Sequence, residues 1–215
     1  MKTNFNSSAG HLAIIAGFFL FSVFRGVSAE PAKDEFKLVK SEQNINLFIR
    51  PVPLNEGYTV RQLKAVLYVK ATPTEVVDLI RDDKNISTWM KAVRNCKNLQ
   101  RLSDDQWITY LIFSVPWPLN DQDCIFRFKK IMQPSGVVIL EFSSDPGYIE
   151  TIEGIKRMKG IKGSWIITPA GDGSCRVEYS ICSYTKPSLP RWLTDPIIQG
   201  NLISSMSAFR EKFNH

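Results

Sequence analysis

One short stretch decides how this chain folds: Val115-Pro116-Trp117-Pro118-Leu119-Asn120-Asp121-Gln122-Asp123. It separates two runs of alternating apolar and polar residues, Trp107 to Ser114 and Cys124 to Met132, which are typical of strands. Proline fixes φ and lacks the N–H that a strand needs, so Trp117 cannot continue either strand. The stretch is therefore predicted to leave the sheet as a stiff loop that carries a large amphipathic ring. Trp117 then either caps the core or serves a functional site.

The N-terminal segment has the pattern of an export signal. Lys2 and a polar stretch precede an apolar run from Leu12 to Phe24, which is shorter than the roughly 20 residues of a membrane-spanning helix. The run is followed by Val27-Ser28-Ala29, whose small residues suit a signal peptidase. We interpret residues 1–29 as a cleaved signal peptide, with a retained N-terminal anchor as the alternative. Residues 30–215 are predicted to form a single domain.

The charge of the chain points away from nucleic acid as a partner. The net charge is +6 at pH 7, and removal of the signal would take away Lys2 and Arg25. The remaining basic residues are scattered, without a run of five. Such a distribution allows only a mild attraction to anionic membrane surfaces.

The cysteines indicate buried apolar positions more than a disulfide framework. Cys96, Cys124, Cys175 and Cys182 are isolated in the sequence. Cys175 and Cys182 lie on one predicted strand, too far apart to bond to each other. We therefore expect at most one disulfide.

Histidine is nearly absent, which argues against several kinds of enzyme. The chain has two histidines, His11 in the predicted signal and His215 at the end. Ser-His and Cys-His nucleophile pairs and imidazole-based metal centres are therefore excluded, and no cofactor or metal is predicted. Carboxylates occur in pairs (Asp82-Asp83, Asp104-Asp105, Asp121 with Asp123), but they fall in polar connections. A solvated turn explains these pairs, with an acid/base pair as the alternative.

The first part of the predicted domain mixes helices and strands. Glu35 to Gln43 is a charged segment that we predict to be a short helix, and Ile45 to Val52 and Tyr58 to Val69 read as strands. A helix is predicted to begin at Thr72-Pro73-Thr74-Glu75, because Thr72 can cap it, Pro73 suits its first position and Glu75 completes a capping box.

The middle of the chain is predicted to be an antiparallel sheet. After a short turn at Ile86 to Met90, which presents Trp89, strand-like runs follow one another from Cys96 to Tyr184. Gly, Pro, Asp and Ser clusters separate these runs, and no helical pattern intervenes. This spacing is typical of an antiparallel meander.

The C-terminus is predicted to be a long amphipathic helix. Thr194-Asp195-Pro196 resembles a cap followed by a helix-starting proline. One face carries an apolar stripe, and the opposite face is polar. The stripe is Ile198, Leu202, Met206, Phe209 and Phe213; the polar face is Gln199, Ser204, Ser207 and Lys212. Such a helix would lie across the concave face of the sheet, which gives an α+β fold.

Strand alternation predicts a large aromatic interior. The four sets of residues that share an inward face are Cys124, Phe126, Phe128; Val138, Leu140, Phe142; Ile161, Gly163, Trp165, Ile167; and Cys175, Val177, Tyr179, Ile181. A filled core and a cavity lined by the same side chains both fit this pattern. Periodicity does not distinguish them.

The order of several motifs resembles the START domain, the steroidogenic-acute-regulatory-related lipid-transfer family, over roughly Phe36 to Phe213. These motifs are Trp89 after a helix, Pro116-Trp117-Pro118 running into Asp121-Gln122-Asp123, Gly154-Ile155-Lys156-Arg157, a strand with Trp165 and Pro169, and Pro187, Pro190 and Trp192-Leu193 before the last helix. The resemblance implies a helix-grip fold, in which a curved antiparallel sheet wraps around a long C-terminal helix. It also implies an internal apolar cavity for one lipid-like molecule, gated by the loop at Pro116–Asp123 and the C-terminal helix.

The chain departs from this family at Gln122, Thr109 and Phe128. Many members have Arg-Asp where this chain has Gln122-Asp123, so an ion pair that anchors the loop is expected to be missing. Thr109 and Phe128 stand where some sterol-binding members have a buried acid and arginine, which favours a more generally apolar ligand. Arg157, by contrast, matches the family's arginine after its glycine-containing segment. It is expected either to form a surface salt bridge with Glu178 or to contact a ligand headgroup at the cavity mouth.

We therefore predict a non-catalytic protein that binds, and carries or transfers, a lipid or other hydrophobic molecule. It is expected to be a monomer that contacts membranes transiently through Trp117 and Trp192, and to be exported to a bacterial periplasm, with secretion as the alternative. Two other hypotheses stay open. One is a cyclase-like or hydrolytic enzyme of the same superfamily, which would need polar side chains inside the cavity and would be favoured if both Glu141 and Glu178 pointed into it. The other is a packed domain without a ligand. The candidate cavity and gate residues are Trp89, Thr109, Phe113, Trp117, Phe126, Phe128, Phe142, Arg157, Trp165, Tyr179, Trp192, Leu202, Met206 and Phe209.

Overall fold

A computed structural model of the chain describes residues 35–214, except 55–56, 115–119 and 187–188. The predicted signal peptide at 1–29 and the predicted loop residue Trp117 lie outside the described residues. Within the described ranges, no helix is both long and apolar enough to cross a membrane.

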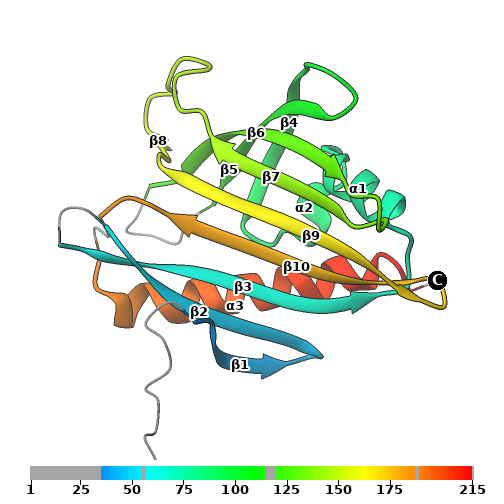
Figure 1. Cartoon of the computed structure of the whole chain (residues 1–215). Coiled ribbons are helices and arrows are strands. Elements are labelled where there is room, and N and C mark those ends of the chain that lie inside the picture. Colours follow the sequence, from blue (N-terminus) through cyan, green and yellow to red (C-terminus); the bar gives the residue numbers. More distant parts are fainter. Residues whose placement is uncertain (1–34, 55–56, 115–119, 187–188, 215) are drawn as a thin grey trace, which may run out of the picture. The chain divides into compact units, whose positions relative to one another are not determined.

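The described strands form one sheet, in the order β1-β2-β3-β10-β9-β7-β6-β5-β4 (Figure 1). Neighbours along this path are antiparallel, and the short β8 pairs in parallel with β6. The pairing of β3 with β10 joins the N-terminal strands to the rest of the sheet. The strands are β1 (Lys37–Glu42), β2 (Ile45–Pro53), β3 (Thr59–Val69), β4 (Val93–Arg101), β5 (Gln106–Phe113), β6 (Gln122–Met132), β7 (Val138–Ser144), β8 (Lys156–Arg157), β9 (Ile161–Gly171) and β10 (Ser174–Ser183).

Strand β1 corrects the prediction of a helix over Glu35 to Gln43. The segment pairs with β2 as a hairpin, from Lys37 opposite Ile49 to Glu42 opposite Ile45. Gln43 and Asn44 have φ angles of 53° and 56°, as the two central residues of a type I′ turn require. The charged residues of β1 belong to an exposed edge strand and not to a helix.

Helix α1 (Pro73–Arg81) begins as the sequence predicts. The Thr72 hydroxyl accepts a hydrogen bond from the Glu75 backbone N–H at 3.3 Å, and the Glu75 carboxylate accepts one from the Thr72 N–H at 2.7 Å. Two backbone donors at the helix start are thereby satisfied by one capping box. The short helix α2 (Ile86–Trp89) follows and buries Trp89.

Helix α3 (Arg191–Glu211) begins earlier than predicted. Pro190 is the N-cap, and Pro196 lies inside the helix and not at its start. The predicted cap residues have other partners, because the Thr194 hydroxyl donates to the Pro190 carbonyl and the Asp195 carboxylate pairs with Arg61. Since Pro196 has no N–H, the helix gives up one internal hydrogen bond there.

Only the C-terminal half of α3 packs into the protein. Met206 and Phe209 are buried, and Leu202 is half-buried, as the apolar stripe predicts. Ile198 is 47% exposed and Ser207 is buried, which contradicts the predicted faces at those two positions. In Figure 1, α3 lies along strands β2 and β3, both of which it contacts. The sheet and this helix form the predicted α+β helix-grip fold.

The core is an aromatic cluster between the sheet and the helices. Trp89 contacts both Trp165 and Phe209, with ring centroids 6.1 and 4.9 Å away. Phe126 and Phe142 are also in edge contact at 5.1 Å. The strand faces predicted by alternation are therefore confirmed for the aromatic residues.

Candidate functional site

The interior is not completely filled. A cavity of about 120 Å³ lies between the sheet and the helices α1 and α2, and side chains from β5, β6, β7, β9 and β10 also line it. The lining residues are Ile80, Ile86, Trp89, Met90, Thr109, Leu111, Phe113, Phe126, Phe128, Phe142, Met158, Ile161, Trp165, Tyr179 and Ile181.

The lining is apolar and uncharged. None of the described residues around the cavity has an acidic or basic side chain. A charged group would be costly here, because an unpaired buried ion loses its hydration without compensation. The cavity therefore suits an electroneutral molecule or molecular fragment.

A few polar atoms interrupt the apolar lining. The Thr109 hydroxyl donates a hydrogen bond to Asn98 Oδ1 at 2.8 Å. The Tyr179 hydroxyl has no hydrogen-bond partner among the described residues, and burial raises the pKa of Tyr179, which keeps the hydroxyl protonated. The indole Nε1 of Trp89 is also buried without an acceptor there.

Most of the predicted site residues lie together at this cavity. Eight of them line it: Trp89, Thr109, Phe113, Phe126, Phe128, Phe142, Trp165 and Tyr179. Met206 and Phe209 are buried in the adjoining core, with Leu202 packed against it, and none of the three lines the cavity. Trp192 is 77% exposed on α3, so its gate role stays a prediction.

Several lining residues were not among the predicted site residues. Ile161 and Ile181 belong to the inward-facing sets that strand alternation predicts, although they were not chosen as site residues. Leu111 lies two residues from Thr109, so the same alternation also indicates it. Ile80 and Ile86 come from α1 and α2, whose packing against the sheet is not visible in strand patterns. Met90 and Met158 lie beyond the ends of regular elements, and no sequence signal marks them.

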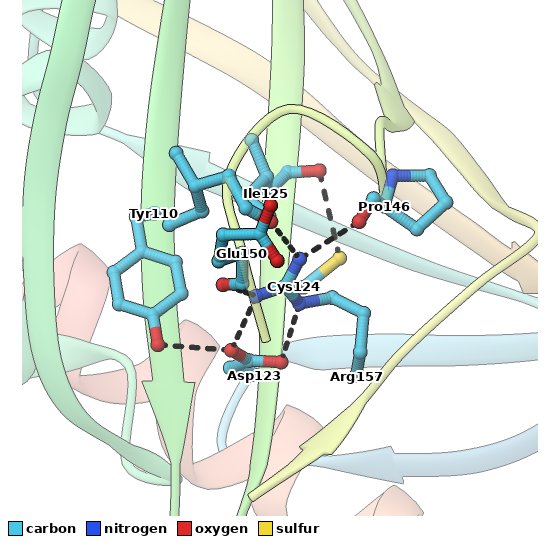
Figure 2. Close-up of polar contacts among 8 residues, drawn as sticks. Tyr110, Asp123, Cys124, Ile125, Pro146, Glu150 and Arg157 are labelled. Carbon is cyan, nitrogen blue, oxygen red and sulfur yellow. Dashed lines mark hydrogen bonds and ion pairs between the residues drawn. The ribbon is translucent and has the colours of Figure 1, made fainter. Parts of the chain in front are cut away.

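Arg157 is part of a buried ionic network and not of a surface salt bridge with Glu178 (Figure 2). Its Nε donates to Asp123 Oδ1 at 2.7 Å and its Nη2 to Asp123 Oδ2 at 3.0 Å. Glu178 instead pairs with Lys64 and Arg176. The side chains of Arg157 and Asp123 are 3% and 1% exposed.

The remaining donors of Arg157 bind the backbone of the segment before β8. Nη1 donates to the carbonyls of Pro146 and Ile149 at 2.8 and 3.0 Å, and Nη2 donates to that of Glu150 at 3.0 Å. All five N–H groups of the guanidinium are thus used within the protein. Arg157 does not line the cavity and has no N–H left for a ligand headgroup.

Tyr110 completes this network from β5. Its hydroxyl donates to Asp123 Oδ2 at 2.9 Å (Figure 2). Burial, with the hydrogen bond to Asp123 adding to it, raises the pKa of Tyr110 to about 12. Asp123 thereby ties β5, β6 and β8 together at one carboxylate.

The start of β6 is anchored although Gln122 replaces the arginine common in the family. Asp121 pairs with Arg94 at 2.6 Å, and Asp123 pairs with Arg157. The carboxylates on either side of Gln122 thus supply two ion pairs at the start of β6. The anchoring of the loop itself stays a prediction, because residues 115–119 lie outside the described residues.

The paired carboxylates of the sequence lie outside the cavity. Asp82 and Asp83 accept hydrogen bonds from backbone N–H groups of neighbouring segments, and Asp104 and Asp105 pair with Arg101 and Lys130. Glu141 is exposed and Glu178 is held by its two cations, so neither reaches the cavity. The positions of Asp82, Asp83, Asp104 and Asp105 agree with solvated turns, and that of Glu141 agrees with a solvent-facing sheet surface. The prediction of a solvated turn is wrong for Asp123, which is buried in β6 and paired with Arg157.

One antiparallel sheet, a long C-terminal helix and an uncharged apolar cavity together define the class of protein to which this chain belongs. Residues 32–215 match the START domain, and the chain is a member of that family.

Relatives of known sequence agree with this assignment. The uncharacterized protein PA1579 of Pseudomonas aeruginosa is 25% identical over 185 residues, which cover 86% of this chain and 90% of that protein. START domain-containing protein 10 of Mus musculus is 21% identical over 174 residues, which cover 80% of this chain and 59% of the mouse protein. The match therefore spans little more than half of the mammalian relative.

Solved structures show the same fold. A STAR-related lipid transfer protein fragment from Xanthomonas axonopodis has a TM-score of 0.76 and 25% identity, covering 85% of this chain and all of that one. Human STARD10 has a TM-score of 0.66 at 19% identity, covering 82% of this chain and 71% of that one.

Proposed function

We propose that the protein binds one lipid or other hydrophobic small molecule in the cavity and carries it between membranes without chemical change. The uncharged apolar cavity of about 120 Å³ is the observation that carries this proposal. Each methylene group removed from water contributes about 0.8 kcal/mol, so such a site holds an apolar chain or ring without any specific contact. The lipid-transfer relative from Xanthomonas axonopodis supports the same role.

A whole lipid requires the cavity to enlarge. Sites for drug-sized ligands measure roughly 300–1,000 Å³, well above the space present here. Met90 and Met158 line the cavity, and methionine side chains adapt readily to different shapes. We propose that these side chains move aside as the ligand enters.

The first turns of α3 suit contact with a membrane surface. Trp192 is 77% exposed, and Leu193, Ile197 and Ile198 are also exposed. Arg191 lies beside them, and tryptophan favours the headgroup region of a bilayer. We propose that this part of α3 is the surface through which the ligand is exchanged, in an exported protein whose N-terminal segment is removed.

The same cavity gives little support to an enzyme. General acid/base catalysis needs a titratable side chain within reach of the substrate, and among the described lining residues Tyr179 alone has a titratable group. Burial raises the pKa of Tyr179, which makes it a poor proton acceptor near neutral pH. We therefore favour binding without catalysis.

Mass spectrometry of an organic extract tests this proposal. The protein would be purified without detergent from its native compartment and, in parallel, after incubation with mixed lipid vesicles. We expect about one apolar molecule per chain in the extract, and exchange of that molecule between vesicles. An extract that is empty under both conditions would contradict carriage.

A further inference from the structure

Two hydrogen-bond donors at the cavity have no acceptor within the described part of the protein. They are the hydroxyl of Tyr179 and the indole Nε1 of Trp89, and both residues are more than nine-tenths buried. The fully buried Nε1 of Trp89 has given up its hydrogen bonds to water at a cost in free energy, and the residues that the structure describes supply no replacement partner for the Tyr179 hydroxyl. A ligand that supplies an acceptor would recover that free energy.

Tyr179 is held firmly in position. It lies on β10, with its ring centroid 4.4 Å from that of Trp165 and 6.0 Å from that of Phe142. Strands β3 and β9 pair with β10 on either side, opposite Ala65 and Trp165. Tyr179 therefore lies on the middle one of three paired strands. Little movement of the backbone is needed for its hydroxyl to donate to a ligand.

The other polar group of the lining cannot take over this role. The Thr109 hydroxyl already donates its proton to Asn98 Oδ1, and it can only accept a further hydrogen bond. Donation to a ligand therefore falls to Tyr179 and Trp89, while the lack of charged lining residues excludes an ionised group.

We propose that the cavity selects electroneutral apolar molecules that carry an acceptor oxygen, such as a carbonyl, and that the Tyr179 hydroxyl donates to this oxygen. Trp89 Nε1, which is fully buried in the cavity wall, becomes a second donor when the indole ring shifts to expose it. This inference rests on the proposed function, since it names the chemical class of the ligand that the cavity takes.

The size of the cavity indicates which probes to use. An engineered apolar cavity of about 150 Å³ binds benzene, so the space of about 120 Å³ here is close to that of a single aromatic ring. A small substituent on the ring is accommodated when the side chains of Met90 and Met158 move aside. Acetophenone and α-methylstyrene have nearly the same shape, and they differ in a C=O against a C=CH₂ group. The difference between their affinities isolates the contribution of the acceptor oxygen.

The experiment measures the affinity of both probes by isothermal titration calorimetry for three proteins. These are the unaltered chain, Tyr179→Phe, and Tyr110→Phe as the matched control. Tyr110→Phe removes a hydroxyl that already has a partner, Asp123, and that does not line the cavity. We expect Tyr179→Phe to lower the affinity ratio of acetophenone to α-methylstyrene about five- to tenfold. Tyr110→Phe should change this ratio less than about twofold.

The outcomes separate this inference from the proposed function. A general loosening of the fold would weaken both probes alike and leave their ratio unchanged. If both probes bind and Tyr179→Phe leaves the ratio as it is in the unaltered chain, the assignment of a donor to Tyr179 is overturned and carriage of apolar molecules stands. If neither probe binds the unaltered chain, the proposed function fails together with the inference.

Discussion

Arg157 uses its whole guanidinium group to hold one segment of backbone to one buried carboxylate. Its sequence context predicts only a strand arginine, which usually faces water. The signal for the alternative was Asp123, a carboxylate that belongs to strand β6 and is followed directly by the apolar run. Such a carboxylate needs a buried partner, but the sequence does not say which of the many cations supplies it.

Arg157→Met should destabilise the protein by about 3–5 kcal/mol, because it leaves the Asp123 charge buried and unpaired. Urea unfolding followed by circular dichroism measures this loss. Arg127→Met is the control, since Arg127 forms an exposed pair with Asp145 and should cost less than about 1 kcal/mol. Equal effects of the two substitutions would contradict a structural role for the buried network.

The cysteine thiols should be unreactive toward thiol reagents in the folded protein. All four thiols are unpaired in the structure, and burial is the main cause that raises each of their pKa values, to about 12 for Cys96 and Cys124. At pH 8 a thiol of that pKa is ionised in roughly one molecule in 10⁴, and the thiolate is the reactive form. We expect no reaction with a disulfide reagent at pH 8 until urea is added, and then four thiols per chain. Fewer than four would reveal a disulfide.

At the scale of elements, the sequence was most informative where local chemistry decides the structure. The capping box at Thr72 fixes the start of α1 through contacts within one helical turn. The same kind of pattern at Thr194-Asp195-Pro196 misled, because Asp195 is bound by Arg61 from a distant strand. Likewise, β1 is a strand because it pairs with β2, and neither its charge nor its propensity shows that pairing.

Gly163 is the point where β9 allows an aromatic side chain to approach the sheet. A Cβ at this position would lie 2.2 Å from Phe142 Cζ and 2.3 Å from the Ser180 carbonyl oxygen. Gly163→Ala should therefore destabilise the protein by about 1–3 kcal/mol and displace Phe142 from the cavity wall. Thermal unfolding measures the loss.

Gly147→Ala is the matched control for Gly163→Ala. Gly147 is exposed, and an added Cβ would meet no atom within 4 Å. Its effect should stay within about 0.5 kcal/mol. If Gly163→Ala is as harmless as this control, the close contact between β9 and Phe142 is wrong.

At the scale of the whole molecule, eight predicted residues lie around one cavity, seven of them on strands and Trp89 on α2. Strand alternation indicates which face of the sheet is inward. It could not show that the interior has space, because a filled core has the same pattern. The residues that it missed come largely from α1, α2 and connecting segments, whose position depends on how helices pack on the sheet. The three residues on α3 that were predicted to line the cavity pack in the core beside it, since the register of a helix on a sheet cannot be read from its stripe alone.

Exposed Trp192 gives a test of membrane contact. Trp192→Ala should weaken partitioning onto lipid vesicles about tenfold, which corresponds to about 1.4 kcal/mol, without loss of stability. Sedimentation with sucrose-loaded vesicles measures the partitioning. Met132→Ala is the control, because Met132 is 65% exposed and lies far from the start of α3. Arg191 at the start of α3 contacts Thr59 at one end of the sheet, and Met132 lies at the other end. Equal losses would contradict the proposal that the start of α3 is the membrane-contact surface.

The central claim is that an apolar molecule occupies the space between Trp165, Phe142 and Met158. A crystal structure of the protein, purified without detergent and soaked with acetophenone, tests it most directly. We expect continuous density for the ring in contact with these side chains, with the carbonyl oxygen within hydrogen-bonding distance of the Tyr179 hydroxyl. Side chains closed over an empty interior, with the probe absent or bound only at the surface, would contradict the claim.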